Sequence, residues 1–169
     1  MGQKEKINSS TTEENMEKTL EYARQKLENI KSISVTDLLK QQETLLRTEK
    51  KRTNSIVFEI LVLLGARIDD GTFYYAIDLG MLGLVKLLVE QYGFDANHAK
   101  GYVPILVAVS ANNATHAEDE QAEIVKYLIE KGANIHIADN QAIENAIEIA
   151  REEKKYKVLK VLLNADESI

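Results

Sequence analysis

Residues 84–97 read LVKLLVEQYGFDAN and residues 124–136 read IVKYLIEKGANIH, and these two stretches decide the fold. In each stretch apolar residues recur at intervals of three and four, which places them on one face of a helix. A glycine then follows, and glycine commonly ends a helix because it adopts the left-handed conformation without steric cost. Both stretches therefore predict an amphipathic helix that ends in a tight turn.

The same pattern occurs elsewhere in the chain. Residues 56–69 read IVFEILVLLGARID, and residues 158–163 read VLKVLL. A recurring unit of this size indicates stacked repeats, because one helix pair cannot bury its apolar face alone whereas stacked pairs share a continuous core. Pro104, the only proline, stands where a further helix would begin, which is the one helical position that suits proline. Alternating apolar and polar residues are almost absent, so no sheet is expected.

The repeated segments resemble the second helix of an ankyrin repeat and the Gly-Ala-Asp-x-Asn turn that follows it. Residues 101–108, GYVPILVA, resemble the Gly-x-Thr-Pro-Leu-His-x-Ala start of the first helix, with Val103 in place of Thr and Leu106 in place of His. Residues 72–76 with Gly80 resemble a more divergent copy. The resemblance covers about residues 53–164. It implies an all-α, ankyrin-type α-solenoid of roughly four stacked helix pairs, the first of them irregular.

The resemblance also suggests how the chain is divided. The segment between Val109 and Ile124 is longer than the family pattern, which predicts an inserted polar loop. We expect a disordered tail at 1–11, an N-terminal helical cap at 12–52 and ankyrin-like repeats at 53–169. Within the last part we expect a partial repeat at about 53–70, full repeats at 71–97 and 98–136 with the inserted loop at 112–120, and a C-terminal cap at 137–169.

The N-terminal part contains an apolar stripe at helical spacing. Its members are Met16, Leu20, Ala23, Leu27 and Ile30. Roughly two heptads are too few to define a coiled coil. We therefore expect this helix to pack on the repeats and cover their first apolar flank, and self-association through the stripe is the alternative.

The composition restricts the possible partners. The 169 residues carry a net charge of −6, with 11 basic and 9 acidic residues in 1–52 and 10 basic against 18 acidic residues in 53–169. This balance argues against a general nucleic-acid binder, which needs a positive field, and favours a protein partner with a basic surface. No apolar run is long enough for a membrane span, and the first residues lack a secretory signal. We expect a cytoplasmic location, or the host-cell cytoplasm for a secreted effector.

No motif for catalysis or cofactor binding occurs. Phosphate-binding, dinucleotide-binding and nucleophile-elbow patterns are missing, and the chain has no cysteine. The histidines lack partners at metal-ligand spacing. Adjacent Asp69 and Asp70 suit ordinary turn chemistry. We therefore expect no enzyme activity, no cofactor and no metal, although an unrecognised site between the N-terminal helices and the repeats remains an alternative.

Tyrosine clusters between residues 74 and 102, and tyrosine is frequent in binding hot spots. The resemblance implies that first helices and turns line a concave binding face. Residues 73–75, Phe-Tyr-Tyr, cannot all point one way, so Tyr74 or Tyr75 could be core. For His136, a structural hydrogen bond is the alternative to binding. The candidate partner-binding residues on the first helices, in the turns and in the inserted loop are Tyr75, Asp78, Asn97, His98, Tyr102, Asn112, His116, His136 and Asn140.

These features suggest a protein–protein interaction adaptor, expected to be a monomer. Its divergent repeats resemble the ankyrin proteins of intracellular bacteria and large DNA viruses, so a host-directed effector is one form of this hypothesis. The alternative is a structural protein that oligomerises through the N-terminal amphipathic helix. The two hypotheses differ in whether the molecular mass in solution increases with protein concentration, which only the oligomerising protein would show.

Overall fold

The structure is a computed structural model that describes residues 7–48, 52–97, 99, 101–111, 118–136 and 145–167. Over these residues the regular structure is helical, which confirms the predicted all-α class. No helix among them is long and apolar enough to cross a membrane. The helices are α1 (Ile7–Ser32), α2 (Val35–Thr48), α3 (Arg52–Leu63), α4 (Asp70–Asp78), α5 (Leu82–Tyr92), α6 (Pro104–Ser110), α7 (Glu118–Glu130), α8 (Ala146–Glu152) and α9 (Tyr156–Asp166).

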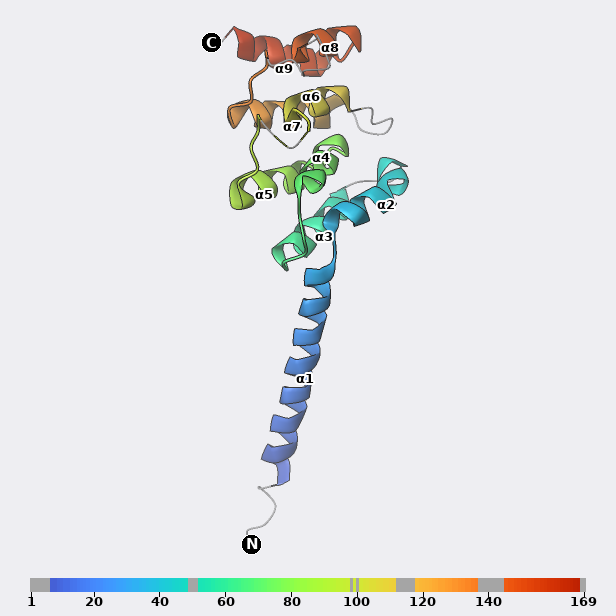
Figure 1. Ribbon diagram of the computed structural model, residues 1–169, viewed down its shortest axis with the longest axis vertical. Helices are drawn as coiled ribbons and strands as arrows, with labels where there is room; N and C mark the ends of the chain where they lie inside the picture. The colour runs from blue at the N-terminus through green and yellow to red at the C-terminus, as the bar shows by residue number, and fades with distance from the viewer. Residues whose placement is uncertain are drawn as a thin grey trace.

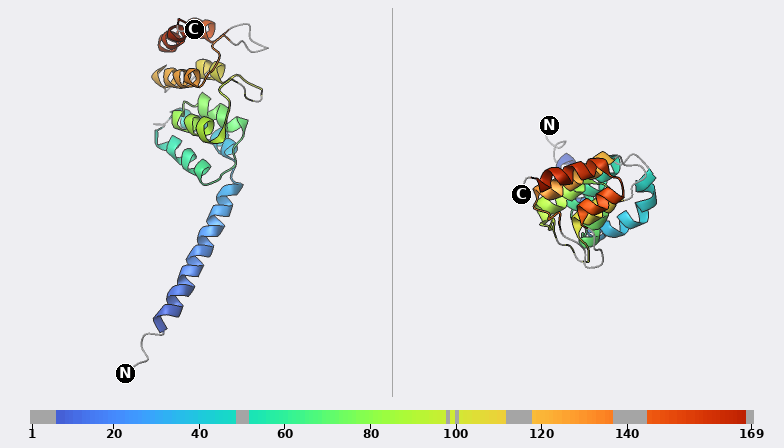
Figure 2. Two further views of the ribbon diagram at one scale, coloured as in Figure 1. Left: turned by 90° about the vertical axis from the view of Figure 1, so that its left-hand side faces the viewer. Right: turned by 90° about the horizontal axis from the view of Figure 1, so that it is seen from above.

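Helices α2 to α9 form four pairs that stack on one another (Figure 1). The first helices of the pairs, α2, α4, α6 and α8, contact one another in order and make one layer. The second helices, α3, α5, α7 and α9, make the other layer in the same way. Figure 2 shows this superposition from above the stack. The arrangement confirms the predicted α-solenoid.

The core lies between the two layers and is formed by the apolar stripes that the sequence pattern predicts. Its large, fully buried side chains come from every pair of the stack. Each such burial contributes about 1.5–3 kcal/mol to folding. The largest of these side chains are Leu39, Phe73, Ile77, Leu79, Met81, Leu84, Leu88, Ile105, Ile124, Leu128 and Leu162.

Glycine and proline mark the helix ends as expected. Gly93 caps α5 with φ +72°, and its N–H donates to the Leu88 carbonyl. Gly132 takes φ +90° after α7. A side chain at either position would be strained in this left-handed conformation. Pro104 occupies the first turn of α6, where its missing N–H leaves no helical hydrogen bond unmade.

The first helix pair differs from the expected division. Helix α2 packs on both α3 and α4, so the stack begins at Val35 rather than near residue 53. The Thr36 hydroxyl fixes this packing, because it donates to Asp69 Oδ1 at 2.5 Å and lies 2.7 Å from Thr72 Oγ1. Helix α7 begins at Glu118, inside the predicted loop 112–120. Residues 112–117 of that loop lie outside the described residues.

Helix α1 also differs from expectation. It begins inside the predicted tail 1–11 and points away from the stack instead of covering it (Figures 1 and 2). Its side chains Leu20 and Leu27 are 53% and 41% exposed. The short link to α2 is held by main-chain hydrogen bonds, since Arg67 N–H donates to Ile33 O at 2.8 Å and Val35 N–H donates to Arg67 O at 3.0 Å. The stripe predicts the helix correctly but not its position.

Candidate binding groove

An open groove of about 280 Å³ runs along the first layer, between α4, α6 and α8. Its volume lies just below the range of about 300–1,000 Å³ typical of small-molecule sites. An open groove of this size suits a few side chains of a docked protein. We call it the first-layer groove. It is lined by Tyr74, Asp78, Tyr102, Val103, Leu106, Val107, Ser110, Ala111 and Ile149.

Helix α6 supplies one wall of the first-layer groove because of its sequence spacing. Positions 103, 106, 107 and 110 follow the i, i+3, i+4, i+7 pattern and share a face. Ile105 and Val109, on the opposite side, are fully buried in the core. The same short helix therefore anchors the stack and presents a mainly apolar surface.

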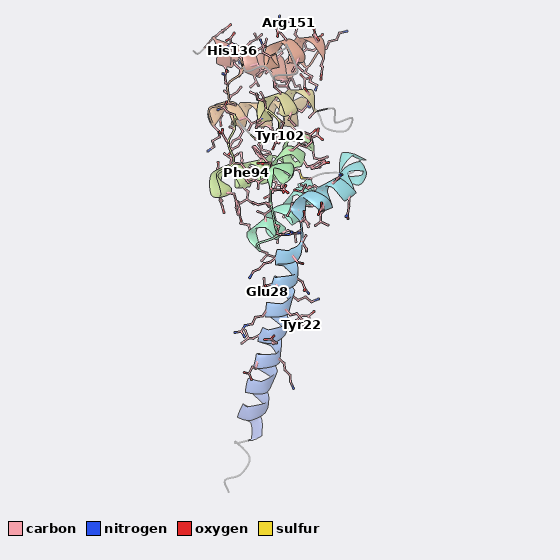
Figure 3. The ribbon with its side chains drawn as sticks, viewed as in Figure 1. Tyr22, Glu28, Phe94, Tyr102, His136 and Arg151 are labelled. Atoms are coloured by element: carbon pink, nitrogen blue, oxygen red, sulfur yellow. The ribbon has the colours of Figure 1, made fainter. Side chains whose placement is uncertain are left out.

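Two tyrosines form the aromatic part of the groove. The rings of Tyr74 and Tyr102 meet edge to face, with centroids 5.3 Å apart and an interplanar angle of 82°. The Tyr102 hydroxyl donates to the Asp70 carbonyl oxygen at 2.8 Å, which fixes its ring between α4 and α6 (Figure 3). Burial, and then the carboxylates of Asp70 and Asp69, raise the pKa of the Tyr102 phenol. Tyr102 therefore remains a neutral donor at physiological pH.

The candidates in the first layer, Tyr75 and Asp78 on α4 and Tyr102 just before α6, occupy different positions. Tyr102 and Asp78 line the groove, and Asp78 is only 8% exposed. Tyr75 is half-buried against the core, with its ring 5.4 Å from that of Tyr74. Of the two adjacent tyrosines, Tyr74 is the one at the surface, at 36% exposure. A role for Tyr75 in binding stays a prediction.

The candidate turn residues have structural partners. Asn97 joins two successive turns, because its Nδ2 donates to Gly132 O and its Oδ1 accepts from Asn134 N–H, both at 2.7 Å. His136 Nε2 lies 3.0 Å from Asp166 Oδ1, and its main-chain N–H donates to Asn134 Oδ1 at 2.9 Å (Figure 3). The remaining candidates, His98, Asn112, His116 and Asn140, lie outside the described residues.

Sequence reasoning missed several groove residues. Val103, Val107 and Ser110 could have been found from their helical spacing after Pro104. Ile149 could not, because it comes from the next helix pair and only the stacking brings it to the groove. No cluster of three or more His, Cys, Asp or Glu side chains suited to a metal ion occurs within the described part of the chain.

Comparisons with known proteins agree with this architecture. Residues 100–140 match the ankyrin repeat family. A putative ankyrin repeat protein of Acanthamoeba polyphaga mimivirus is 30% identical over 94 residues, which are 56% of this chain and 20% of the viral protein. The crystal structure of EF0377, an ankyrin repeat protein, matches with a TM-score of 0.50 and 25% identity. That match covers 63% of this chain and 56% of EF0377.

The chain thus spans a fifth of the viral relative and just over half of the solved one. The family match includes α6, which forms the middle of the first-layer groove, and its partner helix α7. Ankyrin repeats generally serve as protein–protein interaction modules and typically act as scaffolds rather than enzymes. The family match over residues 100–140, the viral relative and the solved structure together show that this chain is similar to ankyrin-repeat proteins in sequence and in fold.

Proposed function

We propose that this chain binds another protein through the first-layer groove. The observation that carries the proposal is the aromatic pair of exposed Tyr74 and partly buried Tyr102, set beside Val107 and Ile149. Tyrosine supplies a large contact area at low entropic cost, and well-packed aromatic side chains dominate binding energy at interfaces. Because Tyr102 is already fixed by Asp70, little ordering is needed when a partner docks.

The charge of the groove favours one kind of partner. Asp78 lies within it, and the Asp69 and Asp70 carboxylates lie near Tyr102. Residues 53–169 also carry an excess of acidic over basic residues, 18 against 10. A segment that presents Lys or Arg beside an apolar side chain would match this surface in charge and in polarity. The viral relative supports a setting in the cytoplasm of a host cell, where such an adaptor would act as an effector.

A pull-down from lysate followed by calorimetry on the captured protein tests this proposal. We expect Tyr74→Ala and Val107→Lys each to weaken binding at least about tenfold, since each removes or blocks a central contact. Tyr156→Ala is the matched control, because this tyrosine is 69% exposed on α9 and does not line the groove. A partner bound equally by the wild type and Val107→Lys, or lost with Tyr156→Ala, would place the binding surface elsewhere.

A further inference from the structure

The N-terminal end of the stack presents a large apolar surface to solvent. Eight of the twelve large exposed hydrophobic side chains in the described structure lie on α1 and on or just after α3, the helices at this end, each 41–62% exposed. We call these eight residues the N-terminal apolar surface, and we propose that a second copy of this chain covers it. They are Leu20, Tyr22 and Leu27 on α1, and Ile56, Val57, Ile60, Leu63 and Leu64 on and just after α3.

Helix α3 has the pattern of a helix with neighbours on two sides. Phe58 and Val62 are buried in the stack. Successive residues of a helix are about 100° apart, so Ile56, Ile60 and Leu63 lie on the opposite side, which is exposed. Helices at the end of a solenoid need a polar outer face for solubility. An apolar second face on an end helix therefore indicates a further packing partner.

The chain's own α1 does not supply that partner. Two main-chain hydrogen bonds hold the link between α1 and α2: Arg67 N–H donates to Ile33 O, and Val35 N–H donates to Arg67 O. Beyond this link α1 runs away from the body, and Tyr22 lies along it, well clear of the stacked pairs (Figure 3). The apolar sides of α1 and α3 thus remain open at one end of the same chain. Two copies related by a two-fold axis would bury both surfaces with one set of residues.

The charge distribution favours contact at this end. Residues 1–52 carry 11 basic and 9 acidic side chains, whereas residues 53–169 carry 10 and 18. Both signs alternate along α1, where Glu21 pairs with Arg24 and Glu28 with Lys31. Two copies that meet through their N-terminal ends keep their acidic halves apart, which avoids like-charge repulsion.

The apolar area is also sufficient for a dimer. A large aliphatic side chain carries on the order of 100 Å² of apolar surface, so eight half-exposed ones offer roughly 400 Å² per copy. Homodimer interfaces are about 65% apolar, which gives on the order of 1,200 Å² buried in total. That value reaches the range of specific interfaces, about 1,200–2,000 Å². The α1 stripe by itself would fall short, so both helices are needed.

Sedimentation equilibrium of the full chain, over roughly a hundredfold range of concentration, tests the proposal. We expect the wild type to approach the dimer mass. Leu27→Lys on α1 and Ile60→Lys on α3 should each raise the dissociation constant at least about tenfold, because each places a charge in the interface. Leu163→Lys is the control, since Leu163 is 38% exposed on α9 at the other end. A monomer at every concentration, or equal loss with the control, would overturn the proposal.

Cross-linking distinguishes a second copy from a rearranged α1. The chain has no cysteine, so a Leu27→Cys/Ile60→Cys variant has two unique attachment points for a bismaleimide. Cross-linked dimers would support the proposal. A link formed only within single chains would show that α1 folds over its own α3, and would overturn it. Circular dichroism of each variant confirms that the helices are retained.

Discussion

Helices α3 and α9 are the second-layer helices at opposite ends of the stack, and they differ in what they expose. Both bury an inner stripe, Phe58 and Val62 in α3 and Val158 and Leu162 in α9. The exposed side chains described on α3 are all apolar, whereas most of those on α9 are polar or charged. Stacking therefore requires only the inner stripe of an end helix. The outer side of the helix takes no part in stacking, and at α3 this side is apolar.

The largest expected effect tests whether the two inner stripes are equivalent. Phe58→Ala should lower the free energy of unfolding by about 3–5 kcal/mol, and Leu162→Ala by about 2–5 kcal/mol, because each leaves a cavity in the core. Urea denaturation followed by circular dichroism measures both. A loss below about 1 kcal/mol for Phe58→Ala alone would mean that α3 is not part of the cooperative stack.

The helix caps allow a second comparison of the two ends. Asn145 accepts hydrogen bonds from Ile147 N–H and Glu148 N–H at the start of α8. Its replacement by Ala should cost about 1 kcal/mol. Asp69→Ala should cost about 2 kcal/mol, because Asp69 Oδ1 caps α4 and also accepts from the Thr36 hydroxyl. Thermal unfolding measures both losses.

Asp69→Asn is the control for the capping comparison, since it keeps the accepting oxygen. We expect it to retain most of the stability that Asp69→Ala loses. Equal losses for Asn145→Ala and Asp69→Ala would show that the hydrogen bond from α2 adds nothing at this end.

A smaller effect is expected at the turns that join the pairs. Asn97→Ala removes two side-chain hydrogen bonds between successive turns and should cost about 1 kcal/mol. Arg67→Ala should change stability by less than about 0.5 kcal/mol, because Arg67 joins α1 and α2 to the first turn through its main chain. Guanidinium denaturation of the two variants in parallel measures both losses of stability. A larger loss for Arg67→Ala than for Asn97→Ala would contradict this expectation.

The smallest effects concern exposed ion pairs. Lys157 Nζ lies 2.6 Å from Asp119 Oδ1 and joins α9 to α7, whereas Lys31 pairs with Glu28 within α1. Lys157→Ala should cost less than about 1 kcal/mol, and less still in high salt, because both side chains are exposed. Lys31→Ala should leave the global unfolding midpoint unchanged. A midpoint shift for Lys31→Ala would indicate that α1 unfolds together with the stack.

The sequence predicted the solenoid because its signals are local. Stripes at intervals of three and four, the turn glycines and Pro104 all act within one or two helical turns, and the structure places them as expected. The pairing of α2 with α3 was missed because α2 lacks the family's turn motif and is held by the contact of Thr36 with Asp69. Such a contact joins residues distant in sequence, so no periodicity indicates it.

The groove shows the same division between local and distant signals. Tyr102 and Asp78 were predicted from the resemblance, and both line the groove. The orientation of Tyr74 relative to Tyr75 stayed open, because both belong to one short helix and only its neighbours decide which ring is buried. The apolar stripe likewise predicts that α1 is a helix, but it does not indicate which surface packs against that stripe.

The bond from Asn97 to the following turn has a mechanical consequence. Asn97 ties the turn after α5 to the turn after α7, at the edge of the stack where these second-layer helices end. Helix pairs that are tied together at one edge separate more easily at the opposite edge. A partner that separated α4 from α6 at the first-layer groove would therefore have to bend the stack against these two hydrogen bonds of Asn97.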